Sequence, residues 1–168
     1  MKFFAPFIPR QVQDRIQIER PDQALAIARA RGGSWLVGTR GRLILVGEQV
    51  VDLPWSEIED AAWDSESATL TIRGLAPYGE PVPTWSHTLI DGDRLVQLLR
   101  ERVHASIISQ RRVELAPGRG FTVIGRRNPL GGAITWMTSY DRQVDPRDPH
   151  VAELVDQALA VSRHEVGV

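Results

Sequence analysis

Short runs of alternating apolar and polar residues, typical of β-strands, fill the chain from residue 34 to residue 90. These runs are rich in β-branched and aromatic residues: "SWLVGTR", "RLILVG", "QVVDLP", "EIEDAAWD", "ATLTIRGL" and "VPTWSHTLI". Glycine- and proline-containing turns separate them, together with the "DSES" turn and the "APYGEP" loop. Short strands at regular spacing with tight turns predict a small antiparallel barrel or sandwich.

A helical period replaces this alternation in "DGDRLVQLLRERVHASIISQ". Apolar residues recur there every four positions, which predicts one apolar face of an amphipathic helix. We expect Asp91 or Asp93 to cap the start of this helix. The residues of the stripe are Leu95, Leu99, Val103 and Ile107.

Three further strands and a last helix are predicted after it. The strands are "RRVELAPG", "GFTVIGRR" and "AITWMTSYD", and the alternation gives Trp136 and Tyr140 one face, on which the last helix would pack. Asp148 suits the N-cap of that helix and Pro149 its first turn, ahead of an apolar stripe that begins at Val151.

The first 33 residues give weaker signals. The opening "MKFFAPFIPRQ" is too short and too rich in proline for a signal peptide, so we expect it to pack on the core. "PRQVQDRIQIER", between Pro9 and Pro21, predicts a short helix. "DQALAIARARGG" fits a helix capped by glycine and also a strand turned by Gly32 and Gly33.

Two segments of the chain resemble bacterial pleckstrin-homology-like (PH-like) and GRAM-type domains. They are "VGTRGRLILVG", residues 37–47, and "VDLPWSEIEDAAWD", residues 51–64. "LAIARA", "RERVHASI" and "DPHVAELVDQAL" are in addition similar to a group of uncharacterised actinobacterial proteins. The resemblance implies a bent antiparallel barrel plugged by a helix at one open end, and it favours a strand for residues 24–31.

We therefore expect an α+β chain in three parts. Residues 1–21 form an N-terminal segment packed on the core, and residues 22–110 form a PH-like antiparallel β-barrel with its capping helix. Residues 111–168 form an extension of a three-stranded β-meander and a C-terminal helix. The PH-like family implies binding roles and transfers no catalytic residue to this chain.

A cluster of carboxylates in residues 52–64 is the first candidate for chemistry. A strand over residues 57–63 would place Glu57 and Glu59 on one face and Ile58 and Asp60 on the other. A carboxylate pair or metal cluster needs side chains that converge, which one strand rarely supplies. We favour a solvated rim beside a corner at Pro54, with Ile58 and a tryptophan in the core. The cluster comprises Asp52, Glu57, Glu59, Asp60 and Asp64.

Motifs for catalysis and for cofactors are missing from the sequence. There is no G-x-S-x-G, S-x-x-K or Walker lysine, and no cysteine for a thiolate site. His150 could bind a metal together with Asp145 and Asp148, but a proline-containing helix cap explains these residues better. We expect a non-enzymatic protein with no cofactor and no metal site.

The arginines are the sequence feature with most potential for ligand binding. Arg29, Arg31, Arg40 and Arg42 surround the first two turns of the expected barrel, where guanidinium groups could grip a phosphate or carboxylate. A second group lies on the tail strands: Arg111, Arg112, Arg119, Arg126 and Arg127. Solvated strand edges are the simpler interpretation of both groups.

Charge and composition narrow the class of partner. A net charge of −1 gives no field that would attract nucleic acid, and no apolar run is long enough for a transmembrane segment. The lack of cysteine fits a cytoplasmic protein. We expect an interaction module that binds a protein partner or forms a homo-oligomer, and as the alternative a binder of an anionic small molecule or lipid headgroup through the first arginine group.

Overall fold

The computed structural model describes residues 5–168, and their contacts divide the chain into two compact units. Unit 1 runs from the first described residues to Ser106 and includes Asn128–Gly132; unit 2 comprises Ile107–Arg127 and Ala133–Val168. The first four residues of the predicted N-terminal segment lie outside the described residues. The chain is α+β, as predicted, with three antiparallel sheets.

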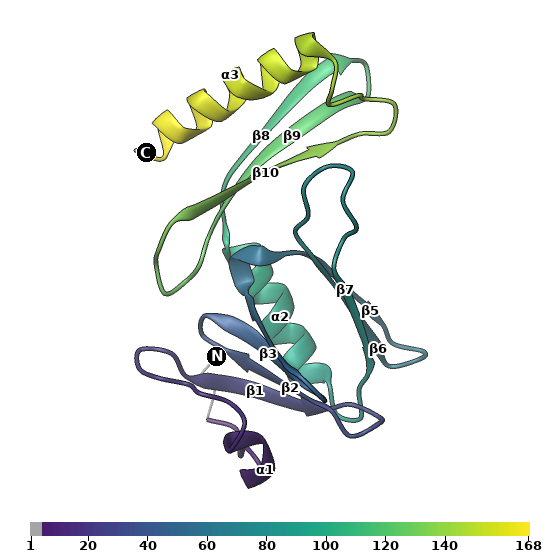
Figure 1. The fold of residues 1–168 in the computed structure, drawn as a ribbon, viewed down its shortest axis with the longest axis vertical. Coiled ribbons are helices and arrows are strands. Elements are labelled where there is room, and N and C mark those ends of the chain that lie inside the picture. Colours follow the sequence, from purple (N-terminus) through teal and green to yellow (C-terminus); the bar gives the residue numbers. More distant parts are fainter. Residues whose placement is uncertain (1–4) are drawn as a thin grey trace. The chain divides into compact units, whose positions relative to one another are not determined.

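Unit 1 has two antiparallel sheets, in the strand orders β1-β2-β3-β4 and β5-β6-β7 (Figure 1). Its elements in chain order are α1 (Arg10–Gln13), β1 (Ala24–Arg29), β2 (Trp35–Thr39), β3 (Arg42–Val46), β4 (Val50–Pro54), the 3₁₀ turn η1 (Trp55–Glu57), β5 (Ile58–Asp64), β6 (Thr69–Gly74), β7 (Thr84–Thr88) and α2 (Asp93–Ala105). The strand predicted for residues 24–31 is thus confirmed, and the predicted short helix is a single turn.

The two sheets share one core, which α2 completes. Leu36 and Leu43 of the first sheet and Ile72 of the second are fully buried in it, together with Leu95 and Leu98 of α2. Gly38 of β2 is required for this packing, because an added Cβ would lie 2.6 Å from Leu98 Cδ2. The helix therefore packs directly on the backbone of β2.

Trp55 is the largest fully buried side chain and forms the corner between the two sheets. Its indole Nε1–H points back to the β2–β3 turn, 3.1 Å from both the Thr39 and the Arg40 carbonyl oxygens. The predicted corner at Pro54 and the tryptophan in the core are confirmed.

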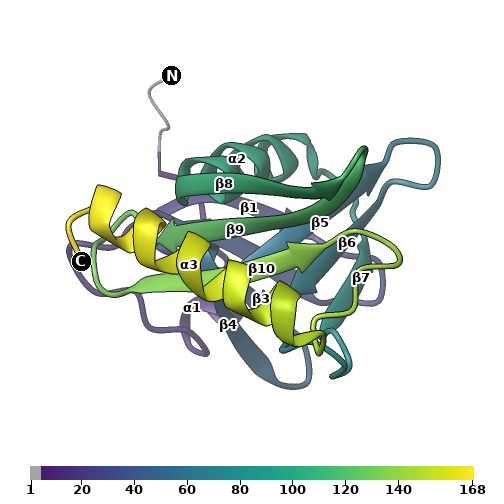
Figure 2. The same cartoon turned by 90° about the horizontal axis from the view of Figure 1, so that it is seen from above.

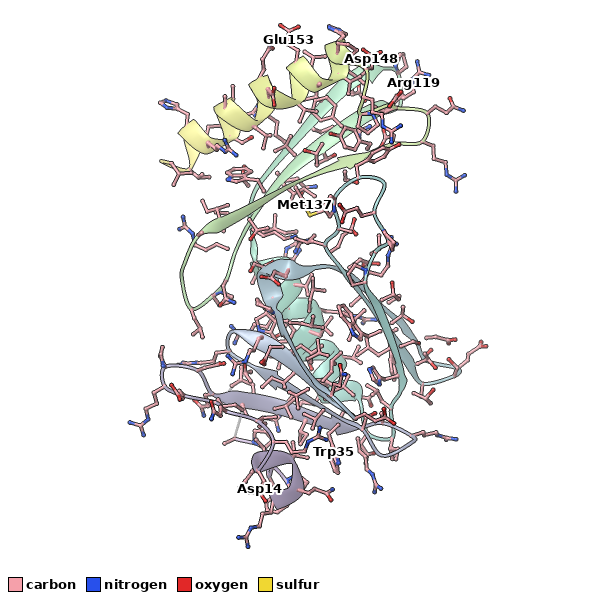
Figure 3. All side chains as sticks on the ribbon, viewed as in Figure 1. Asp14, Trp35, Arg119, Met137, Asp148 and Glu153 are labelled. Carbon is pink, nitrogen blue, oxygen red and sulfur yellow. The ribbon has the colours of Figure 1, made fainter. Side chains whose placement is uncertain are left out.

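The other face of the four-stranded sheet is buried by the N-terminal segment. Val37, Ile44 and Val46 point to this side and cluster with Val12, while Ile8, Ile16 and Ile18 pack around them. Figure 3 shows Trp35 on the same side of the sheet as Asp14, which ends α1. Because both faces are buried, β2 and β3 are almost continuously apolar.

The two sheets do not close into the predicted barrel. Arg31 N–H donates to the Thr88 carbonyl at 2.8 Å and Ile90 N–H to the Arg29 carbonyl at 2.9 Å, so the ends of β1 and β7 meet around a bridge between Ala30 and Leu89. Among the described residues, no backbone hydrogen bond joins β4 to β5. The corner at Trp55 separates these two strands, which is why the hydrogen bonding stops there.

A β-bulge in β5 changes which of its residues face the core, compared with the prediction. The pairing with β6 shifts register between Ile58 and Asp60, which leaves Glu59 as the extra residue. Ile58 and Trp63 consequently both pack on the core, although strict alternation over residues 57–63 places Trp63 with Glu57 and Glu59, on the face opposite Ile58. Sequence periodicity carries no information about a single inserted residue.

The ends of α2 also differ from the prediction. Gly92 is the N-cap and neither neighbouring aspartate supplies a side-chain cap, although Asp93 lies in the first turn. The helix ends at Ala105, and Ile107, predicted to continue the apolar stripe, begins a strand. The two isoleucines that follow the helix are β-branched, which favours an extended chain.

Unit 2 is one three-stranded antiparallel sheet covered on one face by a helix (Figures 1 and 2). Its strand order is β10-β9-β8, from β8 (Ile107–Ala116), β9 (Arg119–Arg127) and β10 (Ile134–Tyr140), and the helix is α3 (Pro149–Glu165). Phe121 and Val123 of β9 are fully buried against Val155 and Ala158 of α3. The predicted meander and last helix are confirmed.

The predicted cap and packing surface of α3 are also confirmed. The Asp148 side chain accepts a hydrogen bond of 2.9 Å from His150 N–H. Trp136 and Tyr140 pack in the α3 cluster, and the Arg163 guanidinium lies 6.0 Å from the Trp136 ring centroid. Met137, the next residue along β10, lies on the side of the sheet away from α3 (Figure 3).

We predict that Trp55→Phe destabilises unit 1 by about 2–4 kcal/mol, because it opens a cavity and leaves two carbonyl groups without their donor. The measurement is denaturant-dependent hydrogen exchange of the β2 and β3 amides. Trp63→Phe, at a half-buried site in the same core, is the control and should cost less. Equal losses for the two variants would show that the indole hydrogen bonds contribute nothing.

Candidate functional site

The structure separates the four predicted ligand-binding arginines into two pairs. Arg29 pairs with Trp35 at one end of the β1–β2 ladder, and Ala24 pairs with Thr39 at the other. Arg31 therefore lies near Arg29, while Arg40 and Arg42 lie around the β2–β3 turn. The five residues of β2 separate the pairs by about 15 Å. One small anion does not span that distance.

Arg29 and Arg42 have partners within the fold. The Arg29 guanidinium lies over the Trp35 ring, 5.7 Å from its centroid. Arg42 Nε lies 3.0 Å from Asp52 Oδ1, and Arg42 Nη2 donates to the Gln17 carbonyl. Arg42 thus links β3, β4 and the N-terminal segment.

Arg15 has the same anchoring role and was missed in the sequence. Its guanidinium donates to the Gly47 carbonyl and, at 2.9 Å, to the Glu48 carbonyl, both in the β3–β4 turn. Between them, Arg15 and Arg42 hold the N-terminal segment on the sheet. No local pattern signals such a role, because both acceptors are backbone groups more than 30 positions away.

A hollow of about 540 Å³ lies between the N-terminal segment and β3 and β4. Arg15 and Arg42 line it together with Asp14, Glu19 and Asp52, so charges of both signs face the same space. The arginine groups are already engaged, and the acids outnumber them. This hollow does not favour an anion.

Arg40 faces a second hollow, of about 720 Å³, with Arg20. The acid in this hollow, Asp22, is buried and already accepts hydrogen bonds from Thr39 Oγ1 at 2.9 Å and from Gly41 N–H at 3.1 Å. Arg40 Nη1 is 3.5 Å from the Pro21 carbonyl, the limit of a hydrogen bond. Arg20 and Arg40 therefore line one hollow whose acid is already engaged, and only the fold brings these two residues together.

A third hollow, of about 570 Å³, is lined by Trp35, His87 and the Gly32–Gly33 turn. His87 Nε2 is buried and has no hydrogen-bond partner among the described residues. Burial lowers the pKa of His87 below its ordinary 6.5, so the imidazole is neutral at neutral pH.

The acids of residues 52–64 have local roles or stay apart. Asp52 pairs with Arg42. Asp64 accepts hydrogen bonds from Ser67 Oγ at 2.7 Å and from Glu66 N–H at 2.9 Å, and these bonds lower its pKa. Across residues 5–168, no group of three or more histidine, cysteine or acidic side chains is arranged to hold a metal ion.

Two of the five tail arginines, Arg111 and Arg112, are engaged within unit 2. Arg112 makes a two-pronged contact with Asp141, and this contact together with Gly120 N–H lowers the pKa of the Asp141 carboxyl. Arg111 bonds to Ser162 Oγ at 3.3 Å and to Glu165, both on α3. Arg126 is almost fully buried. These contacts tie the strands and the helix of unit 2 together.

Comparison with known proteins identifies no relative. No protein-family model matches the chain, and no curated protein or solved structure is significantly similar to it. None of the helices within residues 5–168 has both the length and the apolar character that a membrane crossing requires.

We predict that His87 makes unit 1 less stable in acid. The pKa of His87 is lowered in the folded state, so the unfolded chain binds the proton more readily and the free energy of unfolding falls as the pH drops below 6.5. Chemical denaturation across the range from about pH 7 to about pH 5 should show this fall reduced in His87→Asn. His104→Asn, at an exposed site on α2, is the control and should keep the wild-type profile. A wild-type profile in His87→Asn would contradict the prediction.

Proposed function

We propose that unit 1 is a PH-like domain whose barrel is open between β4 and β5. The order of elements supports this: four strands in one antiparallel sheet, three in the next, then a helix that contacts β1, β2 and β5. The bridge between Ala30 and Leu89 joins the two sheets at one corner. The proposal is a fold analogy, and it favours binding roles without naming a ligand.

We further propose that the chain is a cytoplasmic, non-enzymatic interaction module, which binds a protein partner or a second copy of itself. The outer edge of β8 carries this proposal. β8 is the longest strand of the described residues, with ten, and within unit 2 it pairs on one side only. An unpaired edge offers a row of backbone donors and acceptors to a strand of another chain.

The side chains that were candidates for chemistry support a binding role. These side chains have local partners: Asp52 pairs with Arg42, Asp141 pairs with Arg112, and Asp148 caps the start of α3. Such contacts hold turns and segments in place and leave no convergent acid–base pair among them.

The edge of β8 can be blocked without touching the core. Ile108 is 38% exposed and Gln110 is exposed, so Ile108→Lys with Gln110→Lys adds edge charge, which disfavours strand addition. We expect the immobilised chain to retain a specific protein, or a second copy, and to lose at least about tenfold in affinity with these changes.

Gln97→Lys with Gln157→Lys, at exposed sites on α2 and α3, adds the same charge away from the edge and is the matched control. Sedimentation and affinity measurements give the two readouts. A chain that stays monomeric and binds no protein would overturn the proposal, as would equal retention by the edge variant and the control.

Arg20 and Arg40 support a second candidate function, the binding of an anion. Two guanidinium groups on one concave surface can hold a phosphate or carboxylate through paired hydrogen bonds. Of the four predicted arginines, Arg40 has the geometry that best fits this role. A free phosphorylated molecule and a lipid headgroup share this chemistry.

For this candidate we expect phosphoserine, or vesicles of phosphatidylcholine with phosphatidylserine, to bind at low salt. Arg20→Gln and Arg40→Gln should each weaken binding by about tenfold or more, because each removes a charge-assisted hydrogen bond. Arg31→Gln, at the other end of the sheet, is the control. Calorimetry with phosphoserine and flotation with vesicles separate the two sources. Equal affinity in all three variants would exclude the site.

A further inference from the structure

The side chains of β8 alternate between two faces of the unit 2 sheet. Val113 and Leu115 pack in the α3 cluster, and Arg111 bonds to Ser162 of α3, so these three share the helix-covered face. Gln110, Arg112 and Glu114 fall on the opposite face and are exposed. The edge therefore carries a cation, Arg112, and an anion, Glu114, two positions apart on the face opposite α3.

We propose that β8 pairs antiparallel with β8 of a second copy, with Val113 facing Val113 of that copy. This inference rests on the proposed interaction role and names its partner. It turns the three-stranded sheet of each copy into half of a continuous six-stranded sheet. A two-fold axis through the sheet makes such an interface self-complementary.

The charges on β8 select this register. In an antiparallel pair related by a two-fold axis, one residue must face its own copy. Placing Arg111, Arg112 or Glu114 there sets like charges opposite each other, which destabilises the pair. Placing Val113 there sets Arg112 opposite Glu114 twice, once on each side of the axis, and both pairs are attractive.

The contacts inside unit 2 are compatible with this register. Arg112 is held by Asp141 through two of its five donor N–H groups, so donors remain for a Glu114 carboxylate of the second copy. The cross-strand pair of Val113 with Val113 then lies on the helix-covered face, next to the existing cluster, and the regular stretch of β8, residues 109–114, contains both Arg112 and Glu114. The two copies of α3 consequently cover the same side of the joined sheet.

Complementary charge reversals test the proposal. Glu114→Arg alone faces Arg112 with a cation, and Arg112→Glu alone faces Glu114 with an anion, so each variant should dimerise at least about tenfold more weakly than the wild type. Mixed together, the two variants restore both attractive pairs and should form a heterodimer. Sedimentation velocity of the full chain measures this. Recovery on mixing also shows that both variants are folded.

Two controls separate the edge from general effects of charge and folding. Glu153→Arg makes the same charge change on α3, where Glu153 projects from the helix (Figure 3), and it should leave the dimer intact.

The chain has no cysteine, so Val113→Cys provides a single thiol. In the proposed register it should form a covalent dimer under mild oxidation, because facing residues in a sheet lie within disulfide reach. Gln110→Cys should cross-link far more slowly.

The outcomes distinguish this inference from the proposed function. A dimer that persists in Glu114→Arg alone, or cross-links equally through Gln110→Cys, would overturn the register and leave the interaction role standing. A monomer that binds a different protein would overturn self-association alone. A monomer that binds no protein would overturn both.

Discussion

Burial of the four-stranded sheet on both faces is the constraint on which the rest of unit 1 depends. On one side, α2 packs on the backbone of β2 at Gly38 and Trp55 fills the corner. On the other side, the N-terminal segment covers Val37, Ile44 and Val46. A shift of β2 or β3 by one residue would exchange these two apolar sets and detach Trp55 from the β2–β3 turn. The sheet and both of its coverings are therefore mutually dependent.

Most of the polar side chains around the candidate sites serve this architecture. Arg15 and Arg42 hold the N-terminal segment on the sheet through hydrogen bonds to backbone carbonyls, and Asp22 accepts hydrogen bonds that set the β2–β3 turn. In unit 2, Arg112 and Asp141 connect an edge strand to the segment that follows β10. Such groups are fixed by their partners, whereas the outer edge of β8 and the hollow lined by Arg20 and Arg40 are surfaces that a ligand or partner could use.

The two units present different kinds of surface. In unit 1 the ends of β1 and β7 meet, and the gap in hydrogen bonding falls between β4 and β5. In unit 2 a single sheet has one face covered by α3 and ends in a long strand, β8, whose residues alternate in exposure and whose pairing with β9 shifts register near each end. A long edge with charges of both signs is attracted to a strand of matching pattern and repelled by others. The strand pairing that we propose for β8 takes its selectivity from that property.

The sequence by itself determined the elements, because periodicity and cap chemistry are local. The strands from Trp35 to Thr88, the start of α3 at Asp148, the corner at Pro54 and the face of Trp136 are all fixed by neighbours a few positions away. The bulge at Glu59 and the end of α2 were mispredicted because one inserted residue, or a strand that follows a helix directly, leaves no periodic signal. Only the tertiary structure decided which arginines meet. It placed Arg29 and Arg40 at opposite ends of the β1–β2 ladder, because strand pairing separates residues that are near in the sequence, and it placed Arg20 and Arg40 around one hollow.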